Sequence, residues 1–309
     1  MKAKRILLAG GSGFIGRALA KALIVRGYEV IVLTRTPRQG TGFREVPWDG
    51  EHIGEWIEFL NGAEAVVNLT GRNVNCPHTP ENLREILDSR VNSVRSIAQS
   101  IPHVSLPLLK KPPRTWVQAS AVGFYGDTGD HLSDENSPAG TDALANVCRQ
   151  WEEAFYSAEA PGVRKVALRI GFVLGRDGGA LPVLVKLTRR FLGGSVGNGR
   201  QFISWIHLAD LVQMFIAAIE RENLSGTYNA VGLNPETNRF FMHELRHVLA
   251  RPWSPPVPKF AVRLGARWMN SEPSLALSSQ CCAPIRFLEA GFEYKFSKLR
   301  PALEDLCSS

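Results

Sequence analysis

A glycine-rich turn near the amino terminus constrains the fold of this chain more than any other feature. Gly10, Gly13 and Gly16 are spaced three apart, between the apolar run 6–9 and a segment with helical spacing at 18–23. This pattern predicts a buried parallel strand that turns directly into a helix. Such a turn lets a pyrophosphate approach the backbone, and the free N–H groups of the helix attract the anion. We therefore expect a dinucleotide site here, the alternative being a turn with a purely steric role.

The end of the next predicted strand indicates which nicotinamide cofactor would fit. Residues 28–33 form a second predicted strand, which ends in Thr34 and Arg35. An NAD site usually carries an acidic residue at this point, which binds the ribose hydroxyls. Arg35, with Arg38 close by, would instead attract a 2′-phosphate. The sequence therefore predicts NADP(H) as the cofactor.

The alternation of elements predicts an α/β protein with a doubly wound parallel sheet of the Rossmann type. The 309 residues, 44% of them hydrophobic, can bury a large core. Strand and helix patterns alternate, as in a parallel sheet with right-handed crossovers. We divide the chain into a cofactor-binding domain, 1–175, and a smaller substrate lobe, 176–309, intertwined with it. The expected elements after the second strand are an edge strand at 43–48, strands at 64–70, 116–120 and 166–171, the last of which closes the sheet, and helices at 80–100 and 143–158, with a proline-rich connector at 102–113.

Charge, hydropathy and cysteine usage argue against several other classes of protein. The formal net charge is +7, but the basic residues are dispersed and no nucleic-acid motif is present. No run of eighteen apolar residues occurs, and the first residues run into the first strand without a signal peptide. The five cysteines show no paired C-x-x-C spacing and suggest reduced thiols. We expect a cytoplasmic protein that acts on a small molecule, without a nucleic-acid or membrane partner.

Ordered sequence blocks beyond the glycine turn carry a resemblance to a known family. The chain resembles the extended short-chain dehydrogenase/reductase superfamily, and more closely its atypical branch of nucleoside-diphosphate-sugar-epimerase-like (YfcH-like) proteins. The matching blocks extend over nearly the full length and are 10–16 with Arg35, 68–71, 89–91, 120–126, 147–148 with Trp151 and Glu152, 169–175, 178–181, 199–201, 204–207 with Asp210, 251–252 and 291–292.

The resemblance implies that residues in several parts of the chain contact NADP(H). Arg90 has an independent rationale, because a cation is favoured beside a cofactor that bears several phosphates, although it could be an ordinary surface arginine. Val173 aligns with a position beside the nicotinamide. The full set of expected cofactor-binding residues is Gly10, Ser12, Gly13, Phe14, Ile15, Gly16, Thr34, Arg35, Leu69, Thr70, Gly71, Glu85, Arg90 and Val173.

The chain departs from the wider superfamily at the catalytic positions. Extended members use a Tyr-x-x-x-Lys helix, in which the lysine lowers the pKa of the tyrosine. Aligned on Glu152, these two positions hold Leu144 and Cys148, and neither can replace its counterpart. The remaining candidate proton donors are Ser120 and Tyr125. Each has a structural alternative, as a strand-end hydrogen bond or as loop packing.

Two functions therefore stay open. The first is an NADP(H)-dependent oxidoreductase or epimerase-like enzyme on an unknown substrate, with nucleotide-linked compounds as one candidate class. The second is a non-catalytic NADP(H)-binding regulatory protein, which the missing Tyr and Lys favour.

Two further motifs match enzyme signatures without the required context. His243-Glu244-Leu245-Arg246-His247 fits the H-E-x-x-H pattern of zinc sites, but no obvious third ligand accompanies it, so we expect no metal. Residues 193–197 fit G-x-S-x-G, but a helical pattern precedes them where that motif needs a strand. His207 is weighed as a catalytic base against a buried structural histidine.

Overall fold

The computed structural model describes residues 3–105, 111–268 and 270–308. Its strands are β1 (Arg5–Ala9), β2 (Glu29–Thr34), β3 (Arg44–Pro47), β4 (Ala65–Asn68), β5 (Thr115–Ala121), β6 (Arg164–Ile170), β7 (Phe172–Leu174), β8 (Phe202–Ile203), β9 (Trp205–His207), β10 (Gly226–Ala230) and β11 (Glu236–Thr237). Its helices are α1 (Phe14–Val25), α2 (Pro80–Ser105), α3 (Ala143–Ser157), α4 (Leu181–Arg189), α5 (Leu208–Glu220), α6 (Asn238–Val248), α7 (Lys259–Trp268), α8 (Ser274–Leu277), α9 (Ile285–Glu289) and α10 (Leu299–Cys307), with 3₁₀ turns η1 (Glu55–Leu60) and η2 (Val122–Tyr125).

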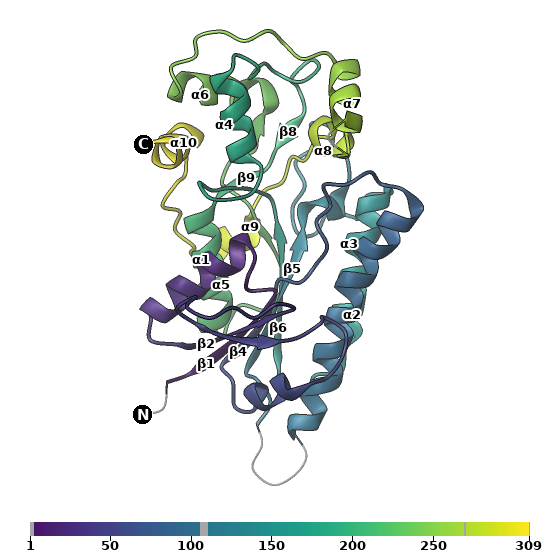
Figure 1. Ribbon diagram of the computed structural model, residues 1–309, viewed down its shortest axis with the longest axis vertical. Coiled ribbons are helices and arrows are strands. Elements are labelled where there is room, and N and C mark those ends of the chain that lie inside the picture. The colour runs from purple at the N-terminus through teal and green to yellow at the C-terminus, as the bar shows by residue number, and fades with distance from the viewer. Residues whose placement is uncertain (1–2, 106–110, 269, 309) are drawn as a thin grey trace.

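A parallel sheet forms the centre of the molecule (Figure 1). Within the described residues, seven strands lie in the order β10-β6-β5-β4-β1-β2-β3, and every neighbouring pair is parallel. The chain first builds outward from β1 to β3 and then returns to add β4 on the other side of β1. A crevice for ligands forms at such a switch point, beyond the carboxyl ends of the strands. The predicted doubly wound Rossmann sheet is confirmed.

Helices cover both faces of this sheet, α1 and α5 on one side and α2 and α3 on the other (Figure 1). Successive side chains of a strand point to opposite faces. Ile6 and Leu8 of β1 accordingly pack with Leu19 of α1, whereas Leu7 packs in the opposite cluster with Phe155 of α3. Burial on both faces explains why the strands read as continuous apolar runs.

The sheet differs from the prediction at one edge. The strand at 166–171 was expected to close the sheet, but β10 pairs with β6 over 226–230 and adds a further edge strand. The sequence of β10 includes Thr227 and Asn229, and these polar residues hide its strand pattern. Helix α2 also runs past its predicted end at Ser100, through Pro102, to Ser105. Residues 106–110 of the predicted connector lie outside the described residues.

A smaller lobe lies beyond the carboxyl ends of the strands (Figure 1). Helices α4, α6 and α10 enclose a separate apolar cluster that includes Leu181, Phe241 and Leu303. Helix α7 is unusual because none of its side chains is buried, and Trp268 is 90% exposed. None of the described helices is both long and apolar enough to cross a membrane.

Candidate functional site

The glycine turn between β1 and α1 has the geometry that the spacing predicts. Gly10 has a φ of +72°, which favours glycine, and a side chain there would lie 3.0 Å from the backbone of Leu69 and Thr70. A side chain on Gly16 would lie 2.5 Å from the Cα of Gly11. The turn therefore packs directly on the end of β4, and α1 packs directly on the turn.

The first turn of α1 is free to bind an anion. Gly13 precedes the helix and provides no side-chain cap, and the first turn contains no acidic residue. The first N–H groups of a helix lack partners within it, so those of Phe14, Ile15 and Gly16 can point toward a ligand. The Phe14 ring lies beneath the glycines of the loop after β7, since a side chain at Gly178 would collide with it.

The end of β2 joins the same turn. The Ser12 and Thr34 hydroxyls are 3.2 Å apart, and Arg17 donates from Nη1 to the Ser12 carbonyl at 3.2 Å. Arg35 follows Thr34 and is exposed. Among the described residues, no carboxylate forms an ion pair with Arg35. Its charge is therefore available to a ligand held at the turn.

The end of β4 contains a polar group without a protein partner. The Leu69 N–H donates to the Ala9 carbonyl at 2.9 Å, and the Thr70 N–H donates to Asn68 Oδ1 at 3.0 Å. The Thr70 hydroxyl oxygen, by contrast, is buried and has no hydrogen-bond partner among the described residues. Buried hydroxyls are normally satisfied, so this one fits a position that a bound molecule completes.

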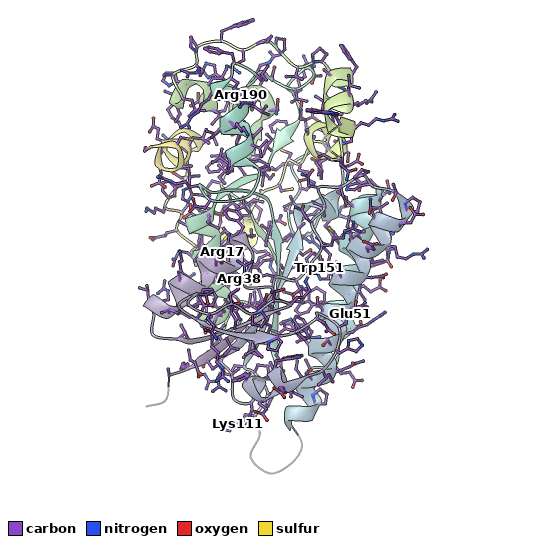
Figure 2. All side chains as sticks on the ribbon, in the orientation of Figure 1. Arg17, Arg38, Glu51, Lys111, Trp151 and Arg190 are labelled. Atoms are coloured by element: carbon purple, nitrogen blue, oxygen red, sulfur yellow. The ribbon has the colours of Figure 1, made fainter. Side chains whose placement is uncertain are left out.

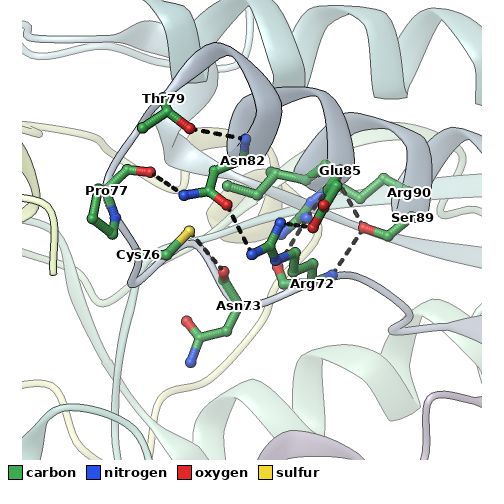
Figure 3. Close-up of polar contacts among 10 residues, drawn as sticks. Arg72, Asn73, Cys76, Pro77, Thr79, Asn82, Glu85, Ser89 and Arg90 are labelled. Carbon is green, nitrogen blue, oxygen red and sulfur yellow. Dashed lines mark hydrogen bonds and ion pairs between the residues drawn. The ribbon is translucent and has the colours of Figure 1, made fainter. Parts of the chain in front are cut away.

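Glu85 and Arg90 of α2 hold the segment that follows β4 (Figure 3). Arg90 donates from Nη1 to the Arg72 carbonyl at 3.0 Å, and its guanidinium lies against Gly71. Its Cζ lies 5.0 Å from the centre of the Trp151 ring. The Glu85 carboxylate pairs with the Arg72 side chain. Sequence reasoning missed Arg72, for which the only signal was its position just beyond a strand end.

Val173 of β7 completes the set of expected cofactor residues. It pairs with Ile206 of β9 in a short two-stranded sheet. Ile15, Leu69 and Val173 are all partly buried against the same core cluster. The structure thus brings residues from the glycine turn, the end of β4 and the end of β7 against one part of the core.

Ser120 and Tyr125 belong to a buried chain of hydrogen bonds. Ser120 donates to Glu152 Oε1 at 2.6 Å, and Arg169 donates to the two Glu152 oxygens at 2.9 and 2.8 Å. Arg169 Nη1 also donates to the Tyr125 hydroxyl at 2.8 Å, and that hydroxyl donates to Asn229 Oδ1 at 2.7 Å. All five side chains are buried.

This network gives both candidate proton donors structural partners within the protein. Burial raises the pKa of Tyr125, against the opposing charge of Arg169, so the phenol stays protonated at neutral pH. Cys148, at the position of the family lysine, is buried as well, and burial raises its pKa to about 12. Cys148 is therefore a neutral thiol that cannot activate a tyrosine, and the half-buried Leu144 offers no hydroxyl.

The histidine candidates from the sequence, His207 and the H-E-x-x-H segment, contact other residues of the protein. His207 Nδ1 accepts from the Ala209 N–H at 3.0 Å, and Nε2 lies 3.3 Å from an oxygen of Asp305. Glu244 of the H-E-x-x-H segment is bound by Arg300 through two contacts, at 2.5 and 3.0 Å. In the part of the chain that the structure describes, no group of three or more His, Cys, Asp and Glu side chains could hold a metal ion.

Most of the chain matches a known protein family. A family model described as the NAD dependent epimerase/dehydratase family matches residues 6–231. The chain belongs to this family. Residues 257–306 match a second model, described only as a domain of unknown function, DUF1731.

Relatives within this epimerase family match the chain over nearly its whole length. The mouse epimerase family protein SDR39U1 is 35% identical over 309 residues, covering 98% of this chain and 99% of the relative. A chloroplastic SDR39U1 homolog of Arabidopsis thaliana is 35% identical over 302 residues, covering 96% of this chain and 85% of the relative. The predicted resemblance is confirmed.

Solved structures give the same answer for the fold. The crystal structure of human SDR39U1 (isoform 2) with NADPH superposes with a TM-score of 0.86 at 32% identity and covers 98% of both chains. A Bacillus cereus UDP-N-acetylglucosamine 4-epimerase superposes with a TM-score of 0.72 at 17% identity, covering 98% of this chain and 95% of its own. The second likeness shows the shared fold alone.

Proposed function

We propose that this protein binds NADPH in the crevice beyond the carboxyl ends of β1, β2 and β4. The observation that carries the proposal is the glycine turn, in which Gly10 packs on the end of β4 and the uncapped first turn of α1 carries no acidic residue. A pyrophosphate fits at the N–H groups of Phe14 and Ile15. The unpaired guanidinium of Arg35 suits the 2′-phosphate of NADP(H) and provides no acceptor for the free ribose hydroxyls of NAD(H).

Other residues around the crevice support the same assignment. The Thr70 hydroxyl would find its missing partner on the cofactor, and Gly71 with Arg90 would line the adjoining wall. Glu85 would act by holding Arg72, and Val173 would lie at the nicotinamide end. The human relative that was crystallised with NADPH supports the choice of cofactor.

We further propose an oxidoreductase or epimerase-like activity on a small molecule in the cytoplasm, without a nucleic-acid or membrane partner. Bound NADPH would supply a hydride, and Ser120 and Tyr125 are the candidate proton donors. The substrate lobe, 176–309, would cover the substrate. Nucleotide-linked compounds are one candidate class.

A non-catalytic NADP(H)-binding regulator is the second candidate, and the buried network favours it. The hydroxyls of Ser120 and Tyr125 are both used in protein hydrogen bonds, and Cys148 cannot supply the missing cation. In that case the bound cofactor would stabilise one conformation of this protein, and a partner would recognise that conformation.

Calorimetric titration tests cofactor binding. We expect NADPH to bind at least ~10-fold more tightly than NADH, because a charge-assisted contact to the 2′-phosphate contributes about 1.5–3 kcal/mol. Arg35→Ala should remove most of that preference, whereas Arg95→Ala, an exposed arginine on α2, should not. Equal or tighter binding of NADH by the wild type would overturn the proposal.

Turnover separates the two candidates. NADPH-loaded protein is incubated with a metabolite pool, and the absorbance of the reduced nicotinamide is followed over hours. Steady oxidation that Ser120→Ala with Tyr125→Phe abolishes supports the enzyme and the two donors. Oxidation at an unchanged rate in this variant removes the donors. No oxidation with any pool counts against an oxidoreductase and leaves the regulator and a redox-neutral epimerase, which does not change this absorbance.

A further inference from the structure

A cavity of about 540 Å³ lies between α4 and the carboxyl-terminal residues 306–308. Its apolar part is formed by Leu181, Pro182 and Val185 of α4 and by Leu306 of α10. Leu181 is buried and belongs to the core of the lobe, so this wall is held firmly. The cavity therefore has a preformed apolar surface that could accept a small organic group.

The rest of the lining is strongly basic. Arg176, Lys186, Arg189 and Arg190 line the cavity, and no acidic residue does. None of the four forms an ion pair with a carboxylate among the described residues. Lys186 and Arg189 in the last turn of α4 suit the dipole of that helix, and Arg176, from the loop after β7, binds a carbonyl in the last turn of α10.

Two observations indicate that these positive charges lie near one another. Arg176 Nη2 donates to the backbone carbonyl of Asp305 at 2.6 Å, which anchors the guanidinium beside α10 while the Asp305 carboxylate faces His207. Cys307 also lines the cavity, and burial raises the pKa of its thiol, opposed by the positive charges of Arg189 and Arg176. The guanidinium groups of Arg176 and Arg189, which come from two different elements, therefore both lie near Cys307.

The cavity is separate from the proposed cofactor crevice. None of the residues that line it belongs to the glycine turn or to the expected cofactor-binding set, although Gly175, one of the lining residues, packs against the Phe14 ring. Figure 2 shows Arg190 well away from Arg17 and Arg38, which lie toward the turn. The cations of the cavity are therefore not those expected to hold NADPH.

We propose that this cavity binds a small organic anion, with its phosphate or carboxylate among the four cations and its apolar part on the wall of Leu181, Val185 and Leu306. Unpaired cations that lie close together repel one another, and an anion relieves this repulsion through charge-assisted hydrogen bonds. The apolar wall would discriminate against a bare inorganic anion, which cannot bury hydrocarbon there.

Calorimetry with four probes tests both parts of this proposal, on full-length protein without cofactor, so that the result does not depend on NADPH binding. The probes are octyl phosphate, octanoate, octanol and inorganic phosphate. We expect octyl phosphate or octanoate to bind with 1:1 stoichiometry, and the tighter of the two identifies the anionic group. Octanol and inorganic phosphate should each bind at least ~10-fold more weakly than that probe. The proposal fails if neither amphiphile saturates the protein by about 1 mM, or if octanol or phosphate binds equally well.

Variants locate the site. Lys186→Gln with Arg190→Gln should weaken binding of the tighter amphiphile by ~10-fold or more, and raising the salt concentration should weaken it in the wild type. Arg84→Gln with Arg95→Gln makes the same change in charge on the exposed side of α2 and should leave the affinity unchanged. Val185→Trp should block binding while all four cations remain. Equal losses in both charge variants, or full binding by Val185→Trp, would place the ligand elsewhere and refute the proposal.

Discussion

Arg169 and Glu152 form a two-pronged ion pair inside the protein, with Nε–Oε1 and Nη2–Oε2 distances of 2.9 and 2.8 Å. Their side chains are only 6% and 7% exposed. The pair connects β6 with α3, and it holds Ser120 at one end and Tyr125 at the other. The two residues that sequence reasoning selects for chemistry are therefore positioned by a pair that it did not select.

Removal of the Glu152 charge should lower the free energy of unfolding far more than removal of the charge on the adjacent Glu153. Glu152→Gln leaves a buried guanidinium without its carboxylate, which costs about 3–5 kcal/mol of unfolding free energy. Glu153→Gln changes an exposed side chain and should cost less than ~0.5 kcal/mol. Urea unfolding followed by circular dichroism measures both, and similar losses would contradict a structural role for the buried pair.

Thr70 should contribute to cofactor binding and not to stability. Thr70→Val removes a buried hydroxyl that has no partner, so we expect the free energy of unfolding of the free protein to be unchanged or to rise by about 1 kcal/mol, while NADPH affinity falls. In the matched change, Thr115→Val, the hydroxyl that accepts from Arg164 is lost, and stability should fall by ~1–2 kcal/mol. Thermal unfolding of both variants, with and without NADPH, separates an effect on cofactor binding from an effect on stability. A loss of stability in free Thr70→Val would contradict the assignment.

Acid should destabilise the protein through His207. Burial lowers the pKa of His207 below 6.5, reinforced by Lys295 and opposed by Asp305 and Asp210. The folded state therefore binds a proton at His207 more weakly than the unfolded state does. The contribution of neutral His207 to the free energy of unfolding is complete above about pH 6.5 and decreases as the pH falls toward the lowered pKa.

The matching experiment compares urea unfolding at about pH 7.5 and about pH 5.5. His207→Asn keeps an acceptor for the first turn of α5 but removes the titration, so it should lose less stability on acidification than the wild type. His131→Asn, at an exposed site, should behave as the wild type does. An identical acid sensitivity in all three proteins would rule out His207 as the cause.

The exposed aromatic side chain of α7 should contribute little to stability. Trp268 is 90% exposed, so Trp268→Ala should change the free energy of unfolding by less than ~1 kcal/mol. Phe155 is fully buried between α3 and the sheet, and Phe155→Ala should cost about 3–5 kcal/mol. Chemical unfolding of the two variants gives the comparison. A large loss for Trp268→Ala would mean that α7 packs more tightly than the structure shows.

Local patterns predicted most of the fold. The strand, turn and helix around Gly10 are contained within about twenty residues, and their apolar period and glycine spacing depend only on near neighbours. Strand β10 was missed because its residues are explained by distant partners. Asn229, in that strand, bonds with Tyr125, which lies 104 positions away.

The candidate site divides in the same way. Gly16 was predicted from the glycine spacing and Thr34 from its place at the end of the second strand, and both stay predictions as cofactor-binding residues. The partners of Ser120 could not be read from the chain, because Glu152 is 32 positions away and its role depends on how α3 docks on the sheet. Its position on the apolar face of an amphipathic helix, beside Trp151 and Phe155, is a signal that the carboxylate needs a buried partner.

The late position of edge strand β10 in the sequence has a consequence for folding during protein synthesis. A nascent polypeptide completes β6 long before β10 leaves the ribosome, and until then the β6 backbone stays open on one side. Open strand edges invite pairing with other chains. A product truncated at residue 175 would keep the β6 edge bare and should aggregate more readily, whereas in the full chain β10 becomes the edge strand and side chains bind its backbone, Glu135 at the Asn229 N–H and Arg286 at the Thr227 carbonyl.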